Sequence, residues 1–472
     1  MESQISSLHA QTGNVVHDHY VAGIAQGLRI IVRTVPTMAV HATFAAVDRI
    51  DRIEWSQNGQ FILAIVKSQG IVQVFSLTDP EWSCRIDTGL SGLSEARFHP
   101  TSSRHILVYA DFGLRMDIWN IETQTCQHVK YVKNAIVPRV SNNGRFGALV
   151  CRHESLESIL IADMTSGESM FSIVKSFSMS VPTDLVNLVW SADDTSIIAV
   201  GSPVHSDLIK LDIHSGTVDG ISLVGAKELG TRVVAFNKHT LIVGGFDESV
   251  RIFSIKSSLS LLAAVSLRAS SLDIIADCPV VFRESLFEGA SERDRNTFDY
   301  GGPNHSGHAV QYREVVPHSY KISLPCVDAL VPSTHATARK LEATGPPRAG
   351  VCAAKLAPSG PWLAVQTDEK ASVLFIVDLV KLKVVQVLIH RQPVRSFEWN
   401  PSRKVDEVAI TSGDSRVFLW SPDYEQRTIE LKDSALKLTS AFWTRTGESL
   451  LVCESERICC VSLDHESEHL GG

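Results

Sequence analysis

Three short stretches of the sequence carry residue types that can bind metal ions or phosphates. Asp111-Phe112-Gly113 matches the metal-binding tripeptide of protein kinases, but no glycine-rich loop and no His-Arg-Asp loop accompanies it. We interpret it as a tight turn before a strand. His17-Asp18-His19 and His305-Ser306-Gly307-His308 have spacings that a metal ion could use, yet no third or fourth ligand lies nearby in sequence. We interpret both as solvated loop histidines and predict no metal site.

No motif of catalysis or of nucleotide binding is present. The chain has no Gly-x-Ser-x-Gly elbow, no P-loop and no Gly-x-Gly-x-x-Gly that follows a strand. We therefore predict a protein without catalytic residues and without a cofactor.

Composition and charge exclude several classes of protein. Of the residues, 44% are hydrophobic and 20% are charged, as in an ordinary globular chain. The net charge of −8 gives no overall attraction to nucleic acid. The nine cysteines contain no Cys-x-x-Cys pair, no basic segment followed by an apolar run opens the chain, and no apolar window is long enough to cross a membrane. These features favour a cytoplasmic protein without a disulfide framework and without membrane insertion.

One strand-turn-strand unit recurs along the chain. Its best copy runs from Ile53 to Ala64, with a Ser-x-x-Gly turn inside it, and is followed by a third apolar strand at Gly70 to Leu77. The apolar residue just before the turn recurs at intervals of about 42 to 50 residues, with one interval of about 120, close to the period of WD-type blades. These anchors are Trp55, Phe98, Val140, Trp190, Phe236, Leu356, Trp399 and Trp443. A ninth, poorer copy precedes them, in His19 to Ala22 and Leu28 to Val32.

Each copy predicts a small antiparallel sheet with two apolar faces, which must stack on its neighbours around an axis. The fold class is therefore an all-β WD-repeat β-propeller of about seven to nine blades. One ring is favoured, whether it uses every copy or seven or eight of them; two lobes are the alternative. The Trp-Asp signature is degenerate, as in Ile118-Trp119-Asn120, so we expect apolar packing to hold the blades together.

The long interval divides the chain. We predict blades in residues 1–256, an insertion in 257–350, blades in 351–463 and a flexible tail in 464–472. Within the insertion, Val280 to Glu284 and Val315 to Ile322 could be strands, whereas Gly289 to Gly307 has a composition typical of disorder.

The joint at Asp79-Pro80-Glu81-Trp82 is a candidate binding site. It is predicted to join two blades, and its tryptophan either packs into the seam between blades or stands exposed as an anchor for another protein. Both interpretations stay open, and Pro80, Glu81 and Trp82 are our candidate partner-binding residues.

Several segments resemble one family of WD-repeat proteins. Ile53-Glu54-Trp55-Ser56, the strand Gly70 to Leu77 and the joint Pro80 to Asp87 are similar to IEWS, GLVQVWSL and PEWxCKID in the WD repeat-containing protein 8 family, and they occur in the same order. Pro393 to Pro401 resembles its SPVRAFQWDP, and Asp277 to Glu284 in the insertion resembles its DPKIVVYKE. The chain is identified by these motifs as a divergent member.

This resemblance implies a non-catalytic scaffold at the centrosome, microtubule-organising centre or spindle pole. Family members join a coiled-coil microtubule-anchoring protein, and in some lineages a minus-end-directed kinesin, to hold microtubule minus ends. The same complex is associated with spindle organisation and with centriole and cilium assembly. The alternatives are a substrate-receptor or assembly-factor propeller in ubiquitin ligation or ribonucleoprotein biogenesis, for which no Trp-Asp-x-Arg motif or basic face is evident, and a propeller hydrolase.

Overall fold

Short strands account for nearly all the regular structure in the computed structural model. In Arg52–Trp55 (β6), Ile53 and Trp55 are buried while Arg52 and Glu54 are partly exposed, which is the period-two pattern of a strand with one covered face. The described residues form no α-helix, only the one-turn 3-10 helices Lys67–Gln69 (η1), Gly89–Ser91 (η2) and Asp111–Gly113 (η3). The structure describes residues 4–7, 15–17, 20–35, 37–133, 136, 138–164, 171–179, 184–202, 207–222, 224–225, 228–229, 231–236, 239–255, 259–267, 280–286, 310–315, 350–403, 405–423, 426–431, 435–454 and 457–462.

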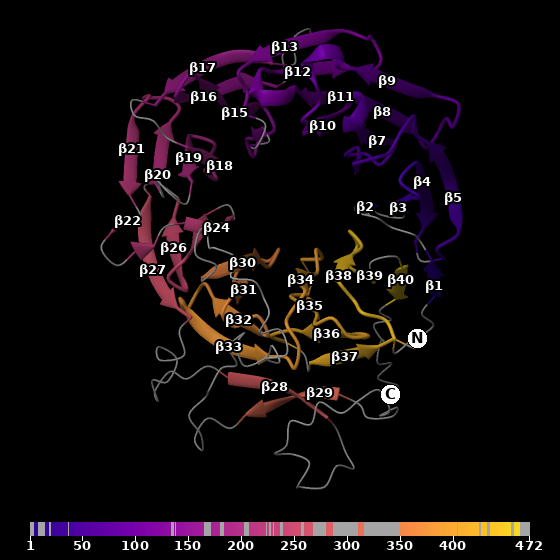
Figure 1. Cartoon of the computed structure of the whole chain (residues 1–472). Coiled ribbons are helices and arrows are strands. Elements are labelled where there is room, and N and C mark those ends of the chain that lie inside the picture. Colours follow the sequence, from indigo (N-terminus) through magenta and orange to yellow (C-terminus); the bar gives the residue numbers. More distant parts are fainter. Residues whose placement is uncertain are drawn as a thin grey trace, which may run out of the picture.

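Within these residues the strands form nine antiparallel blades that follow one another around a single ring (Figure 1). This confirms the predicted propeller. Blades one to three are Val15–His17 (β2), Tyr20–Ala25 (β3), Arg29–Thr34 (β4) and Val40–Ala45 (β5); β6, Phe61–Val66 (β7), Ile71–Ser76 (β8) and Ser83–Asp87 (β9); and Glu95–His99 (β10), Ser102–Tyr109 (β11), Arg115–Asn120 (β12) and Cys126–Lys130 (β13).

Blades four to six are Arg139–Val140 (β14), Phe146–His153 (β15), Leu156–Asp163 (β16) and Ser172–Ser178 (β17); Leu185–Trp190 (β18), Ser196–Gly201 (β19), Asp207–Asp212 (β20) and Val218–Ser222 (β21); and Thr231–Phe236 (β24), Thr240–Gly245 (β25), Ser249–Ser254 (β26) and Ser260–Ser266 (β27). A small hairpin of Val224–Gly225 (β22) and Glu228–Leu229 (β23) lies between the fifth and sixth blades in sequence.

Blades seven and eight are Val351–Leu356 (β30), Trp362–Thr367 (β31), Val373–Asp378 (β32) and Lys383–Ile389 (β33); and Ser396–Trp399 (β34), Val408–Thr411 (β35), Arg416–Trp420 (β36) and Arg427–Glu430 (β37). The ninth blade combines both ends of the chain. Ser440–Trp443 (β38), Ser449–Cys453 (β39) and Arg457–Ser462 (β40) come from the end of the sequence, and Gln4–Ser7 (β1) adds the fourth strand. Because β1 pairs antiparallel with β40, from Gln4 opposite Cys460 to Ser7 opposite Arg457, backbone hydrogen bonds close the ring.

The insertion extends the seventh blade outward. Val280–Leu286 (β28) pairs in parallel with β33, and Val310–Val315 (β29) pairs antiparallel with β28, which gives a six-stranded sheet whose added strands lie outside the ring (Figure 1). The predicted start of the insertion at 257 was wrong, since β27 completes the sixth blade. That strand buries only Val265, so it carries little of the apolar signal of the repeat. Residues 289–307, 316–322 and 464–472 lie outside the described residues.

The core lies in the seams between blades. One cluster joins Leu63 and Val72 of the second blade to Phe98 and Ile106 of the third, and all four are buried. A blade alone would expose this surface to water, so neighbouring blades stabilise one another.

The Ser-x-x-Gly turn of the second blade connects its two inner strands, β6 and β7. The Ser56 hydroxyl accepts a hydrogen bond from the Phe61 amide at 2.9 Å, and Gly59 has a φ of 69°. A side chain is strained in this left-handed region, which explains the glycine. Among the described residues no helix could span a membrane.

Candidate interaction surface

The predicted anchors end the innermost strands of their blades. Trp55, Phe98, Trp190, Trp399 and Trp443 are at most 7% exposed. Each of these five rings packs in the seam with the preceding blade and so holds the end of its own innermost strand in the ring.

Three of the tryptophans also hydrogen-bond across the seam, which the sequence pattern did not predict. Each indole Nε1 donates to a backbone carbonyl at the end of the preceding blade's innermost strand: Trp190 to Arg139 at 2.7 Å, Trp399 to Lys355 at 2.8 Å, and Trp443 to Glu398 at 2.9 Å. In each case the acceptor is the residue just before that blade's own anchor. The anchors therefore connect consecutive blades through polar bonds as well as apolar packing.

Phe236 departs from the prediction of a buried anchor. It ends β24 in the expected position but is 39% exposed. The next blade has Leu356 where four other blades have tryptophan, and the smaller side chain provides no indole to cover the end of β24. An open hollow of about 420 Å³ results, lined by Ala235, Phe236, Lys355, Leu356, Pro358, Glu398, Trp399 and Pro401.

This hollow has an apolar floor and a charged rim. Lys355 forms an ion pair with Glu398, and the Lys355 ammonium lies 5.2 Å from the centre of the Phe397 ring. Phe236 contributes exposed aromatic surface, and the Arg139 guanidinium lies 5.8 Å from its ring centre. Such a surface can accept an apolar side chain from another protein and surround it with polar groups.

The Pro80-Glu81-Trp82 joint is a hydrogen-bonded turn between β8 and β9. Both strands belong to the second blade, so the prediction that the joint joins two blades was wrong. The amide of Asp79 donates to the Ser76 hydroxyl at 3.1 Å, and the amide of Trp82 donates to the Asp79 carbonyl at 3.1 Å. Trp82 is half-buried, packs on the core between the second and third blades, and lies 5.3 Å from Phe61 between ring centres. Pro80 and Glu81 are exposed. The structure thus places the tryptophan in the seam and presents its two neighbours to solvent.

The stretches that resemble chemical motifs have structural explanations where they can be described. Asp111–Gly113 is the turn before β12, as predicted, and Phe112 is 96% exposed with a φ of 58°. Of the two histidine pairs, only His17 falls in a described strand, and its side chain is not among those described. Residues 305–308 lie outside the described residues.

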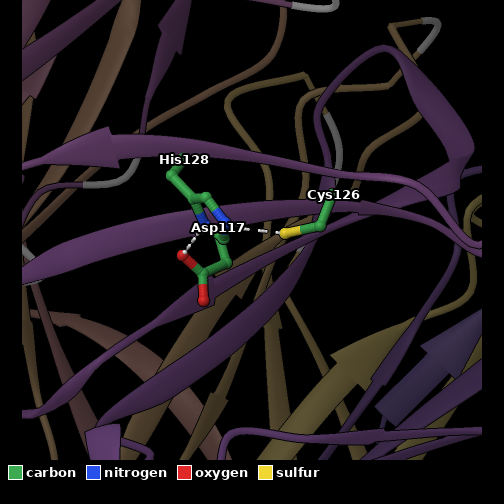
Figure 2. Close-up of side chains that lie close together, drawn as sticks. All are labelled: Asp117, Cys126 and His128. Carbon is green, nitrogen blue, oxygen red and sulfur yellow. Dashed lines mark hydrogen bonds and ion pairs between the residues drawn. The ribbon is translucent and has the colours of Figure 1, made fainter.

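One group of metal-binding residue types was missed. Asp117, Cys126 and His128 place their ligand atoms within 4.8 Å of one another (Figure 2). Burial and, secondly, the Asp117 carboxylate raise the pKa of the Cys126 thiol to about 11. The Cys-x-His spacing in a strand was a usable signal, because it puts both side chains on one face. Asp117 could not be assigned to them without the register of β12 against β13.

One curated protein is similar to most of the chain. WD repeat-containing protein WRAP73 from Mus musculus is 27% identical over 452 residues, which covers 94% of this chain and 92% of that protein. No family model matches the chain. The similarity to WRAP73 indicates no enzymatic family.

The solved structures that resemble the chain do so with TM-scores below 0.5. The C-terminal WD40 domain of Sif2 has a TM-score of 0.48 at 10% identity and covers 98% of both chains. Dihydro-heme d1 dehydrogenase NirN in complex with DHE has a TM-score of 0.48 at 9% identity, covering 89% of this chain and 73% of its own. The Cps50 (Swd1) β-propeller domain of Myceliophteria thermophila has a TM-score of 0.37 at 10% identity, covering 98% of this chain and 100% of that domain. At these TM-scores none of the three similarities bears on function.

Proposed function

We propose that the chain, a WD-repeat β-propeller by its nine blades and by its similarity to WRAP73, is a non-catalytic scaffold of the centrosome or spindle pole. It joins a coiled-coil microtubule-anchoring partner, and in some cells a minus-end-directed kinesin, to hold microtubule minus ends. Spindle organisation and centriole and cilium assembly depend on that link. The observation that carries the proposal is the similarity to WRAP73 over 94% of this chain and 92% of that protein.

The motif resemblance agrees with this similarity, because WRAP73 is an alias of WD repeat-containing protein 8. The Pro80 to Asp87 segment, which resembles that family, contains the exposed residues Pro80 and Glu81. Exposed side chains in a hydrogen-bonded turn contribute little to the core and are available to a partner. This supports the joint as one contact of the scaffold.

The architecture suits a bridging role. A ring closed by strand pairing and filled at every seam presents its surface loops at fixed positions. A rigid surface loses little conformational entropy when it binds a helix or a coiled coil. Glu81 adds a negative charge to the joint, which favours a partner surface with lysine or arginine.

A charge reversal tests the joint without disturbing the core. Trp82→Ala alone would be ambiguous, since the ring packs on Phe61. Glu81→Lys keeps that packing and should weaken recovery of the coiled-coil partner in a pull-down by about tenfold, the loss expected for a well-placed interfacial charge. Asp423→Lys is the matched control, because Asp423 is an exposed acid in the corresponding connection between β36 and β37. Equal recovery with both variants would remove the joint from the interface.

Location and partners test the function as a whole. The tagged protein is purified from dividing cells and imaged against a microtubule-pole marker. We expect it at the poles, with a coiled-coil protein as its main partner. Diffuse fluorescence with recovery of ubiquitin-ligase subunits or ribonucleoprotein assembly factors would contradict the proposal and favour the alternative class.

A further inference from the structure

The two outer strands of the third blade bring together an aspartate, a cysteine and a histidine (Figure 2). Asp117 lies on β12 directly opposite His128 on β13, and Cys126 lies two residues before His128. Residues two apart in a strand point to the same face, and directly opposed residues of an antiparallel pair do so as well. The three side chains therefore share one face of the blade as a consequence of the strand register.

All three ligand atoms lie within 4.8 Å of one another, and two of their separations can be compared with those in a metal coordination shell. The Cys126 Sγ lies 3.7 Å from the His128 Nδ1, and the His128 Nδ1 lies 2.7 Å from the Asp117 Oδ1. Ligands on a tetrahedral zinc ion, with bonds of about 2.0 to 2.3 Å, are about 3.3 to 3.6 Å apart. The sulfur–nitrogen pair nearly meets this requirement as it stands. The nitrogen–oxygen pair is now a hydrogen bond and must open by about 0.6 Å, which a small rotation of the exposed imidazole supplies.

We propose that Asp117, Cys126 and His128 bind a divalent transition metal ion, zinc above all, with a fourth coordination position open to solvent. One thiolate, one imidazole nitrogen and one carboxylate oxygen form a mixed set that suits zinc and does not suit magnesium or calcium, which prefer oxygen ligands. The His128 side chain is 54% exposed, so an ion can reach the group and keep a water ligand.

Binding of the ion has a defined proton balance. The Cys126 thiol gives its proton to solvent and becomes a thiolate ligand, and His128 binds the ion through Nδ1 as a neutral imidazole that carries its proton on Nε2. Starting from a neutral imidazole, each ion bound therefore releases one proton, that of the thiol.

Arg115 holds the carboxylate in place for this site. Its Nε lies 3.0 Å from the Asp117 Oδ1 and 3.2 Å from Oδ2. Asp117 is 5% exposed, so its orientation is fixed by Arg115 and by the surrounding strands. A buried carboxylate held by a charged donor is typical of the outer support that positions metal ligands. The ion would tie the outermost strand β13 to β12.

Cobalt is the probe for this site, because Co²⁺ takes zinc positions and has an absorption band when a thiolate binds it. The purified full-length protein is titrated with CoCl₂ and then with ZnCl₂. We expect one equivalent of cobalt with a thiolate-to-cobalt band, which zinc then displaces. Cys126→Ser should abolish the band, and His128→Gln should weaken cobalt binding by at least about tenfold.

Cys84→Ser is the matched control, since Cys84 is also a half-buried thiol on the outermost strand of a blade. It should keep the band and the affinity. Unfolding midpoints measured with a chelator present establish that all variants fold. No thiolate band in the unchanged protein, or a band that survives Cys126→Ser, would overturn the assignment.

Discussion

At the scale of single residues, the tryptophan anchors combine two kinds of interaction in one side chain. Trp399 packs in the core between the seventh and eighth blades, and its indole donates to the Lys355 carbonyl at 2.8 Å. Trp399→Phe keeps most of the packing and removes the hydrogen bond, so the free energy of unfolding should fall by about 1 to 2 kcal/mol. Trp399→Ala also leaves a cavity and should cost about 3 to 5 kcal/mol.

Urea unfolding of the variants separates these two contributions. Trp82→Ala is the comparison, because Trp82 is only half-buried and is not one of the three tryptophans whose indoles bond across a seam. It should cost less than Trp399→Ala. If Trp399→Ala unfolded at the same urea concentration as the unchanged protein, the anchor would have no role in stability.

The buried carboxyl of Glu284 makes the free energy of unfolding depend on pH. Glu284, on β28, is buried, and burial raises the pKa of its carboxyl to about 7. The Arg391 amide donates to this carboxyl at 2.9 Å, Asp414 adds a like charge, and Arg391 and Arg416 add opposite charges. His390 lies 4.0 Å away, and burial lowers its pKa to about 3, so it is neutral in the relevant range.

The sign of the effect follows from the raised pKa. Between about pH 4.5 and 7 the unfolded chain ionises Glu284 while the folded chain retains the proton, so stability falls as pH rises through this window. Glu284→Gln cannot ionise, and its free energy of unfolding should exceed that of the unchanged protein by about 2 to 3 kcal/mol above pH 7, with the difference vanishing near pH 4.5. Denaturant titrations of both proteins at several pH values measure this. A difference that does not change with pH would show that Glu284 is not the titrating group.

At the scale of strands, the sequence predicts the inner part of each blade better than its rim. Residues such as Ile62 and Val74 lie in strands buried by two neighbouring blades and give a strong apolar signal. β27 buries only Val265, and β1 is the short, mostly polar run Gln4-Ile5-Ser6-Ser7, so neither has a recognisable pattern. The outermost strands are held mainly by backbone pairing with one neighbour, which sequence periodicity does not encode.

The candidate sites also divide into features that the local sequence predicts and features that it does not. Trp399 and Trp443 could be found as anchors, because each is a large apolar residue before a turn. The hollow beside Phe236 could not, since it arises where Leu356 of the next blade replaces a tryptophan and leaves Phe236 uncovered. Likewise, Asp117 is brought to His128 only by the pairing of β12 with β13. Contacts between elements depend on register and neighbours, and one sequence does not specify these by local pattern alone.

The strand β1 contributes to stability through its backbone pairing with β40. Deletion of residues 1–7 removes its four paired residues and leaves β40 as an open edge. The free energy of unfolding should fall by about 2 to 4 kcal/mol, given about 1 kcal/mol for each hydrogen bond lost. The exposed edge should also promote association between chains. Thermal unfolding and light scattering measure the two effects, with a deletion of residues 464–472 as the control; an unchanged midpoint would contradict the role of β1.

At the scale of the whole molecule, the ring is closed because one blade is shared by both chain ends. The other blades are each formed by consecutive strands, so a break in the chain inside a blade leaves the two ends joined by strand pairing. A break between blades leaves them joined only by the contacts across a seam, which are apolar packing and a few side-chain hydrogen bonds and ion pairs. These two kinds of closure should differ in strength, because strand pairing adds hydrogen bonds to the packing.

Two circular permutants that differ only in the cut position separate these closures. In both, a short turn joins Ser462 to Gln4, which lie near each other because Gln4 pairs with Cys460. A cut between Asp79 and Pro80 falls inside the second blade, so β9 pairs with β8 across the new ends and stability should stay close to that of the unpermuted protein.

A cut between Leu90 and Ser91 falls between the second and third blades, inside the one-turn helix η2, where Leu90 is fully exposed. The new ends are then held only by the seam that contains Leu63 and Phe98. This permutant should unfold with a free energy lower by about 2 kcal/mol or more, because no strand crosses between the ends. Denaturant unfolding of the two permutants decides the matter: equal midpoints would mean that seam packing closes the ring by itself and that the shared ninth blade adds nothing to it.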